Sequence, residues 1–416
     1  MSSSKNPTSS SKLPYIPSEI WIQIFPKLPA KTLLRFRCVC KSWRSIIDNP
    51  DFVHLHFQHS QINSENNMSN KLLLTLEGMG HYGNEGCVLT VCDAQTLAKI
   101  DRIARIHSDR YRILGSCSGL LLVERSNYRS TCHHELRLWN PCIRKLLILP
   151  TCPLRSYLND DTTWYVLGFA PHTQDYKVVK FAFDKYQDSG NVYIAVYTLS
   201  NQQWTIRNDP LTVPILDNYY RCRLFDSVST AVFFRGAVHW LGIIDNLTHA
   251  FTHLASFDFD HEKITFLELP FTCEEKGTLR FLFFLRGSLA VFSISEVTSS
   301  IWMLDLDNQK RPWTLWFSGK STLDGYKAFE LCSANLEKAR LVSLSPEKEA
   351  KERMIKVFYC ESDGGYLVCG NKAYNIASGK VQPFKRYMSS HLKLETYSES
   401  LVLSNAYGAR DLRSFS

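Results

Sequence analysis

The chain has 416 residues, of which 44% are hydrophobic and 21% are charged, and its formal net charge at pH 7 is +8. This composition is typical of a globular protein with a sizeable core, and the length predicts about two or three domains. Because no apolar run is long enough to cross a bilayer and the basic residues are scattered, the sequence argues against a membrane protein and against a nucleic-acid-binding protein.

The first residues, MSSSKNPTSSSK, are polar and rich in serine, so residues 1–12 are expected to be disordered. They lack the apolar core of a secretory signal, which favours a location in the cytosol or the nucleus. The 13 cysteines show no disulfide framework and include no CxxC pair, so we expect reduced thiols rather than a zinc site. The densest Cys/His cluster (Cys132, His133, His134) is interpreted as a polar loop, because adjacent strand residues point to opposite faces.

Residues 13–57 show the pattern of three short helices. Pro17 is a residue type common at helix starts, and apolar residues then recur at helical spacing. Pro26 and Pro29 end this first helix, because a proline nitrogen cannot donate to the helical ladder, and Pro29 opens the second helix. The third helix contains Trp43 and is expected to stop at the turn signal DNPDF.

These helices carry more apolar residues than they can bury among themselves. Ile22 lies off the stripe that Ile20 and Ile24 define, and Leu33 and Leu34 cannot both point fully inward. A surplus of this kind implies a partner, which is either the rest of the chain or another protein.

Residues 58–70 are polar and predict a linker, after which the segments become short, apolar and strand-like. A loosely kept unit recurs along this region: a first strand, then a second strand, a polar turn and another strand. The first strand of a unit is expected just after each of Gly119, Gly236, Gly287 and Gly365. Such a recurrence predicts a β-propeller of about six blades over residues 71–408, followed by a tail at 409–416. Two packed β-sandwiches are the alternative.

Both ends of this region are expected to complete the ring. The segments KLLLTL and CVLTVCDAQTLAKI, from Lys71 onward, predict an early blade, and SLVLS near Leu401 is expected to return and close the ring. In bodies of this kind, recognition is usually carried by the loops between strands on one face.

The stretch IPSEIWIQIFPKLPAKTLLRFRCVCKSWRSIIDNPDFVHLHF closely resembles the F-box of plant F-box proteins, in which Leu/Ile-Pro is followed by RLPxKSLxRFxCVCKxW, Pro-x-Phe and a His. The segments GSCSGLLL, LWNPCIRK, LGFAPHTQDYKVVK, VYTLSNQQW, FFRGAVHWL and FDFDHEKI resemble the kelch-like, F-box-associated region of the same family. The sequence departs from the family pattern in two ways. Pro26 predicts a shortened first helix, and the kelch signature is poorly kept. The resemblance implies an α+β multidomain chain with an F-box at 13–57 and a propeller-like all-β domain at 71–408.

The resemblance implies a substrate-recognition subunit of an SCF-type ubiquitin ligase. In such a complex the F-box docks on a Skp-family adaptor, which connects it to a cullin, and the β-domain binds a target protein for ubiquitination. The target, and any small molecule that assists its binding, are not written in the sequence. By motif match, adaptor contact is expected at Ile16, Pro17, Ile20, Ile24, Leu28, Pro29, Leu33, Leu34, Val39, Cys40 and Trp43. Apolar and aromatic anchors of this kind dominate helix-mediated interfaces.

A propeller-based enzyme or binding protein that acts outside ubiquitination is the alternative, since fold alone does not decide function. His239 alternates with apolar neighbours, which favours a local hydrogen bond over a catalytic base. The cluster Asp258, Asp260, His261 and Glu262 is typical of a turn between strands rather than of a metal site. We therefore expect a non-catalytic protein without metal or cofactor.

The helical region contains the basic residues Lys27, Lys31, Arg35, Arg37, Lys41 and Arg44. They wrap round the helices and do not form the single basic stripe of a nucleic-acid-binding surface. We interpret them as a solvated face that complements an acidic partner and speeds docking. Between them, Cys38 and Cys40 are interpreted as small apolar residues at a tight junction of helices.

Overall fold

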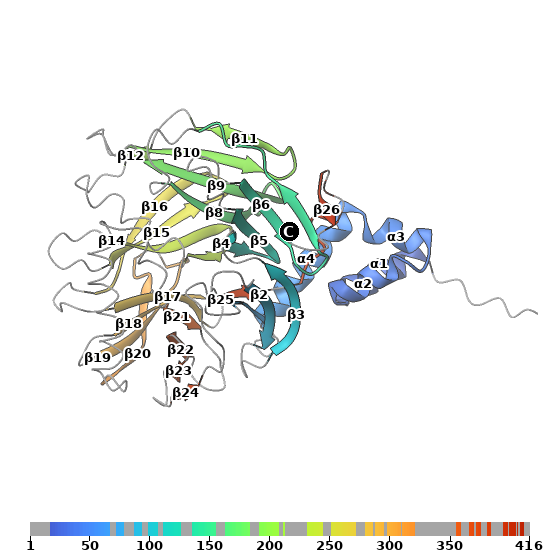
Figure 1. Cartoon of the computed structure of the whole chain (residues 1–416). Coiled ribbons are helices and arrows are strands. Elements are labelled where there is room, and N and C mark those ends of the chain that lie inside the picture. Colours follow the sequence, from blue (N-terminus) through green and yellow to red (C-terminus); the bar gives the residue numbers. More distant parts are fainter. Residues whose placement is uncertain are drawn as a thin grey trace, which may run out of the picture.

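The structure is a computed structural model of the whole chain. The residues that it describes are 17–66, 72–78, 87–93, 99–106, 111–125, 135–154, 163–183, 191–207, 211–212, 231–243, 251–271, 279–285, 288–294, 298–308, 310–320, 355–358, 366–369, 372–375, 381–383, 394–397, 399–404, 406 and 408–411. The predicted disordered segment 1–12 therefore lies outside the described residues. Helices α1 to α3 project from one side of a large β-body, and α4 leads back into it (Figure 1). None of the described helices is both long and apolar enough to span a membrane.

Prolines set the ends of the first helices, as the sequence predicts. The helical elements are α1 (Ser18–Ile24), the 3-10 helix η1 (Phe25–Lys27), α2 (Ala30–Phe36), α3 (Lys41–Ile47) and α4 (Pro50–Asn66). Pro17 and Pro29 precede α1 and α2 with extended backbones. Pro26 lies in η1 and cannot donate to an α-helical ladder, so α1 is short, as predicted.

The fourth helix corrects the sequence analysis. The signal DNPDF ends α3, but Pro50 also begins α4, because the first turn of a helix does not need the missing N–H group. The side chain of Asn49 caps this start by accepting a hydrogen bond from the Asp51 amide at 2.8 Å. Helix α4 continues to Asn66, so the expected linker at 58–70 begins inside a helix.

The described strands form six antiparallel sheets, which we number as blades 1 to 6. Blade 1 consists of β25 (Leu394–Tyr397), β1 (Leu72–Gly78), β2 (Cys87–Asp93) and β3 (Lys99–Ile106). Blade 2 consists of β4 (Tyr111–Cys117), β5 (Leu120–Arg125), β6 (Glu135–Asn140), β7 (Lys145–Ile148) and β26 (Arg410–Asp411). Blade 3 consists of β8 (Thr163–Ala170), β9 (Asp175–Phe183), β10 (Asn191–Thr198) and β11 (Gln203–Ile206), with β12 (Leu211–Thr212) beside β10.

The other three blades repeat the same order. Blade 4 consists of β13 (Val232–Phe234), β14 (Ala237–Ile243), β15 (Phe251–Asp258) and β16 (Lys263–Glu268). Blade 5 consists of β17 (Leu279–Leu285), β18 (Ser288–Ile294), β19 (Thr298–Leu304) and β20 (Trp313–Lys320). Blade 6 consists of β21 (Ile355–Phe358), β22 (Tyr366–Cys369), β23 (Lys372–Asn375) and β24 (Val381–Pro383). The prediction of a propeller-like body with about six blades is confirmed in these residues.

The first strands of neighbouring blades contact one another, for example β25 with β4, β4 with β8, and β17 with β21. The glycines that the sequence analysis placed before first strands precede second strands instead. Gly119 and Gly236 occupy two-residue turns with φ values of 85° and 77°, and the residues before them, Ser118 and Arg235, also have positive φ. Tight hairpin turns of this kind need positive φ at both central positions, which explains the glycines.

Strands from both ends of the β-region share blade 1, because β25 pairs with β1 with Leu72 opposite Tyr397. The closing strand is therefore residues 394–397, and not the predicted SLVLS near Leu401. The predicted tail at 409–416 is also corrected in part, since β26 pairs with β7 and the Lys145 amine lies 2.9 Å from the Asp411 carboxylate. The remaining residues of that tail, 412–416, lie outside the described residues.

Candidate functional site

Four aromatic rings form the centre of the helical region. The ring of Phe25, which has no exposed surface, lies 5.3 Å from that of Trp21, 5.1 Å from that of Trp43 and 5.7 Å from that of Phe36. Tilted and edge-on contacts at these distances are favourable beyond the area that they bury. This cluster joins α1, η1, α2 and α3 into one small module.

The outside of this module is apolar to an unusual degree. Ile20, Ile22 and Ile24 of α1 are 44%, 44% and 42% exposed, and Val39, between α2 and α3, is 62% exposed. We call these four residues the apolar surface. Because large apolar side chains are stabilised by leaving water, a gathering of them on a short helix indicates a contact that the chain alone does not complete. The sequence analysis noted Ile22 but left it out of the predicted contact set.

The structure divides the predicted contact residues into groups. Ile16 lies outside the described residues, while Pro17, Ile20, Ile24, Pro29, Val39 and Cys40 are exposed, and Leu28, Leu34 and Trp43 are half-buried. Leu33 is different, because none of its side-chain surface is exposed. Leu33 packs in the buried cluster that the module shares with blade 2.

The basic residues of the helical module differ in their exposure and in their contacts. Lys27, Arg35 and Lys41 are exposed. Arg37 donates a hydrogen bond to the Asp48 carboxylate at 2.8 Å, and the Nε atom of Arg44 lies 3.4 Å from the same carboxylate. The contact of Arg37 with Asp48 thus ties the end of α2 to the end of α3, whereas that of Arg44 lies within α3, where its side chain stays largely exposed.

The two cysteines of the junction are exposed, which corrects their interpretation as packed apolar residues. The Sγ atom of Cys40 instead caps α3 and accepts a hydrogen bond from the backbone amide of Trp43 at 3.5 Å. The hydroxyl group of Ser42 and the Trp43 amide lower the pKa of the Cys40 thiol below its ordinary value.

Helix α4 joins the helical module to the β-body. On one side, the ring of Phe52 contacts that of Phe25 edge-on at 6.4 Å. On the other side, the ring of Phe57 lies 5.1 Å from that of Phe169 and 6.2 Å from that of Tyr176, on strands β8 and β9 of blade 3. The module is therefore packed against the propeller by buried aromatic side chains.

A buried histidine secures the same helix. The Nε2 atom of His56 lies 3.0 Å from the carbonyl oxygen of Leu28, which can only accept, so Nε2 carries the proton. Burial is the main reason that the pKa of His56 lies below its ordinary value. The neutral ring thus connects α4 to the segment between η1 and α2.

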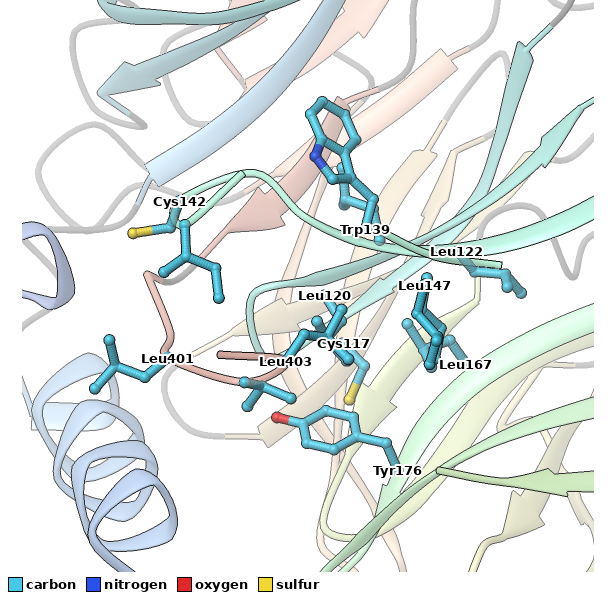
Figure 2. Packing of buried hydrophobic residues seen from close by; sticks show 14 of the residues in the cluster. Cys117, Leu120, Leu122, Trp139, Cys142, Leu147, Leu167, Tyr176, Leu401 and Leu403 are labelled. Atoms are coloured by element: carbon cyan, nitrogen blue, oxygen red, sulfur yellow. The ribbon is translucent and has the colours of Figure 1, made fainter. Parts of the chain in front are cut away.

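Residues 399–403 run between the helices and blade 2, and we call them the C-terminal strap. Figure 2 shows Leu401 and Leu403 among the apolar side chains of blade 2, with helical ribbon of the N-terminal region beside them. Leu401, Val402 and Leu403 are buried in one apolar cluster that also contains Phe25 and Leu33 of the helical module. The core of the module is therefore continuous with the core of the propeller.

Candidate catalytic groups of the β-body have structural roles. His239 is buried, its Nδ1 atom lies 2.7 Å from the Ser256 hydroxyl and its Nε2 atom lies 3.3 Å from the Phe234 carbonyl oxygen. The hydrogen bond predicted for this residue is confirmed, and burial lowers its pKa to about 4. Asp258 accepts hydrogen bonds from the amides of Asp260 and His261, as expected of a turn.

Within the described part of the chain, no group of three or more His, Cys, Asp or Glu residues is arranged to hold a metal ion. The Cys/His cluster at 132–134 lies outside the described residues. The arrangement as a whole is a small helical module with exposed apolar side chains beside a larger β-body.

The chain matches two known families. Residues 90–402 match the F-box associated beta propeller domain, and residues 13–55 match the F-box domain. An F-box/kelch-repeat protein of Arabidopsis thaliana is 21% identical over 72% of this chain and 78% of its own length. An F-box protein of the same plant is 28% identical over 42% of this chain and 39% of its own length. An F-box only protein of that plant is 23% identical over 93% of this chain and 96% of its own length.

Proposed function

The chain belongs to the family of F-box proteins with an F-box associated beta propeller domain, and from this we propose that it is the substrate-recognition subunit of an SCF-type ubiquitin ligase. In this role the helical module binds a Skp-family adaptor, which connects it to a cullin. The propeller binds the target protein, and the chain itself supplies no catalytic group. The observation that carries the proposal is the apolar surface on an otherwise well-packed module.

The residues of the adaptor contact follow from exposure and motif together. Ile20, Ile24 and Val39 present their apolar side chains directly, and we add Ile22, which is equally exposed. Pro17, Leu28, Pro29, Leu34, Cys40 and Trp43 extend the contact through their exposed or half-buried surfaces, and Ile16 belongs to it by motif match. Burial of several such side chains against a partner is the type of interaction that dominates helix-mediated interfaces.

The test replaces two of these side chains in the full chain. Ile20→Asp with Ile24→Asp would place two charges in an apolar interface, which costs several kcal/mol in binding, so affinity for a recombinant Skp-family adaptor should fall on the order of a hundredfold or more. Binding is measured by titration calorimetry. Ile206→Asp is the matched control, because Ile206 is an isoleucine of similar exposure, 40%, on strand β11 of the propeller.

Equal binding by the double variant and the control would remove the proposed contact. If the unaltered chain fails to bind any Skp-family adaptor, the proposed ligase function is wrong. In that case the alternative, a propeller-based protein that acts outside ubiquitination, takes its place.

The target is proposed to bind the propeller through loops between strands. The helical module lies at the ends of strands that are joined by short turns, since Phe57 contacts Phe169 and Tyr176 on either side of the turn at 171–174. Arg125 of β5 and Phe183 of β9, after which the next connections of the chain begin, lie at the opposite ends of the strands, because successive turns of an antiparallel sheet alternate between its two ends. Exchange of such a connection for a short Gly/Ser loop should abolish target binding and leave adaptor binding unchanged.

A further inference from the structure

The third and fourth strands of blades 2, 4 and 5 are joined by turns with the same side-chain hydrogen bond. In blade 4 the Asp258 carboxylate accepts from the amide two residues later at 2.8 Å, and in blade 5 the Asp305 carboxylate does so at 3.0 Å. In blade 2 the side-chain oxygen of Asn140 accepts from the Cys142 amide at 3.1 Å. The acceptor role is shared, but blade 2 alone of these three has an amide in place of a carboxylate.

The second half of the Asn140 amide explains this difference. Its Nδ2 group lies 3.0 Å from the Ser400 carbonyl oxygen, 3.1 Å from the Ser400 hydroxyl oxygen and 2.7 Å from the Val402 carbonyl oxygen. A carboxylate at this position could not donate to any of them. Asn140 has no exposed surface, so water cannot replace these hydrogen bonds if they are lost.

The strap continues from this attachment to the helical module. The Glu399 carboxylate lies 3.4 Å from the amine of Lys31 on α2. After it, Leu401 and Leu403 are buried in the cluster that Phe25 and Leu33 share with blade 2. A segment of five residues therefore touches the propeller through the Asn140 amide and apolar packing, and the module through an ion pair and apolar packing.

We propose that the C-terminal strap, held by Asn140, fixes the orientation of the helical module on the propeller, so that the apolar surface and the propeller move as one body. Only the biological purpose of this rigidity rests on the proposed ligase function. In a ligase, the strap would set the position of a bound target relative to the cullin. Asn140 is a positioning residue in this arrangement, because it touches neither partner and acts through the strap.

Hydrogen exchange of the full chain without any partner tests the proposal. Asn140→Asp keeps the acceptor of the turn but removes every donor to the strap and places a charge against its carbonyl oxygens. Amide exchange in residues 30–66 and 399–403 should become at least about tenfold faster, because these segments lose a shared attachment. A control at the exposed turn of blade 5 is Asp305→Asn, which makes the reverse exchange of side chains and should leave exchange in both segments unchanged.

Two results would overturn the proposal. In the first, Asn140→Asp speeds exchange in the strap alone while residues 30–66 stay as protected as before. In the second, Asp305→Asn has the same effect as Asn140→Asp, which would indicate a general loss of stability.

A charge exchange supplies the second test if Asn140→Asp does not fold. Glu399→Lys should speed exchange in α2 about threefold, as expected for loss of a partly exposed ion pair, and the double variant Glu399→Lys with Lys31→Glu should restore protection. Exchange as fast in the double variant as in the single one would contradict a role for this end of the strap. Since no adaptor is present, failure of the proposed ligase function would leave these results untouched.

Discussion

Helix α1 and the strands of blade 2 carry similar apolar residues but differ in how far these residues are exposed to solvent. Ile20, Ile22 and Ile24 of α1 are each more than 40% exposed, whereas Leu121, Leu122 and Val123 of β5 are fully buried. A blade is complete within the chain, since its neighbours cover it on both faces. Helix α1 is covered on one side only, and the apolar residues on its uncovered side favour contact with another protein.

The difference in exposure between α1 and blade 2 does not separate the helical module from the propeller, because the two share one core. Phe25 and Leu33 lie in the same buried cluster as Leu120 and Leu138 of blade 2, and the strap runs between them. The helical module therefore carries its exposed apolar residues on a base whose core is continuous with that of the propeller. Substitutions in the surface and in the base should have separable effects, which the predictions below exploit.

The largest effect is expected for Leu33→Ala. Removal of a fully buried leucine side chain leaves a cavity, which should lower the free energy of unfolding of the whole chain by about 3 kcal/mol. The matched variant Ile20→Ala shortens an exposed side chain and should change stability by about 0.5 kcal/mol or less. Denaturant unfolding of both variants measures the difference, and equal effects would break the distinction between surface and base.

The second prediction concerns pH and the buried His239 of blade 4. Burial lowers the pKa of this residue from 6.5 to about 4, so the unfolded chain binds a proton before the folded chain does. The contribution of His239 to stability is therefore unchanged above pH 6.5 and becomes less favourable as the pH falls from 6.5 to 4, by at most about 3 kcal/mol.

The variant His239→Gln, which keeps hydrogen-bonding capacity without titrating in this range, isolates that contribution. It should be less sensitive to acid than the unaltered chain when unfolding is followed between pH 7 and pH 4. His56 of α4 also has a lowered pKa because of burial. An equal acid sensitivity of the two proteins would assign the loss to other groups, His56 among them.

Helix starts and turns differ in how well the sequence predicts them. Pro17 and Pro29 predict helix starts because the constraint lies in the proline itself. Pro50 misleads, since a proline both follows the end of one helix and begins another, and only the surrounding packing distinguishes the two cases. The glycines at 119 and 236 locate turns correctly but not the strands before them, because nothing in the sequence of β4 or β13 marks a first strand.

Contacts between distant residues are the part that no local pattern reveals. Asn140 ends strand β6 and Ser400 is 260 positions away, and the residues next to each in the sequence give no sign of the contact. The burial of Leu33 is hidden for the same reason, because the helical spacing of Leu33 and Leu34 does not say which of the two faces the propeller. Sequence motifs predict which residues meet a partner, and the three-dimensional arrangement shows the buried base on which these residues stand.

The smallest effect is expected from the exposed cations around the apolar surface. Arg35→Glu with Lys41→Glu should slow association with a Skp-family adaptor several-fold at low salt, because charges at a rim steer encounter more than they hold the complex. The effect should fade at high salt, where such charges are screened, and dissociation should change little. Lys263→Glu, a reversal of an exposed charge on β16 of the propeller, should leave both rates unchanged in stopped-flow measurements. A loss that persists at high salt would mean that Arg35 or Lys41 lies inside the contact and not at its rim, and the contact would then extend from the isoleucines of α1 onto α2 or α3.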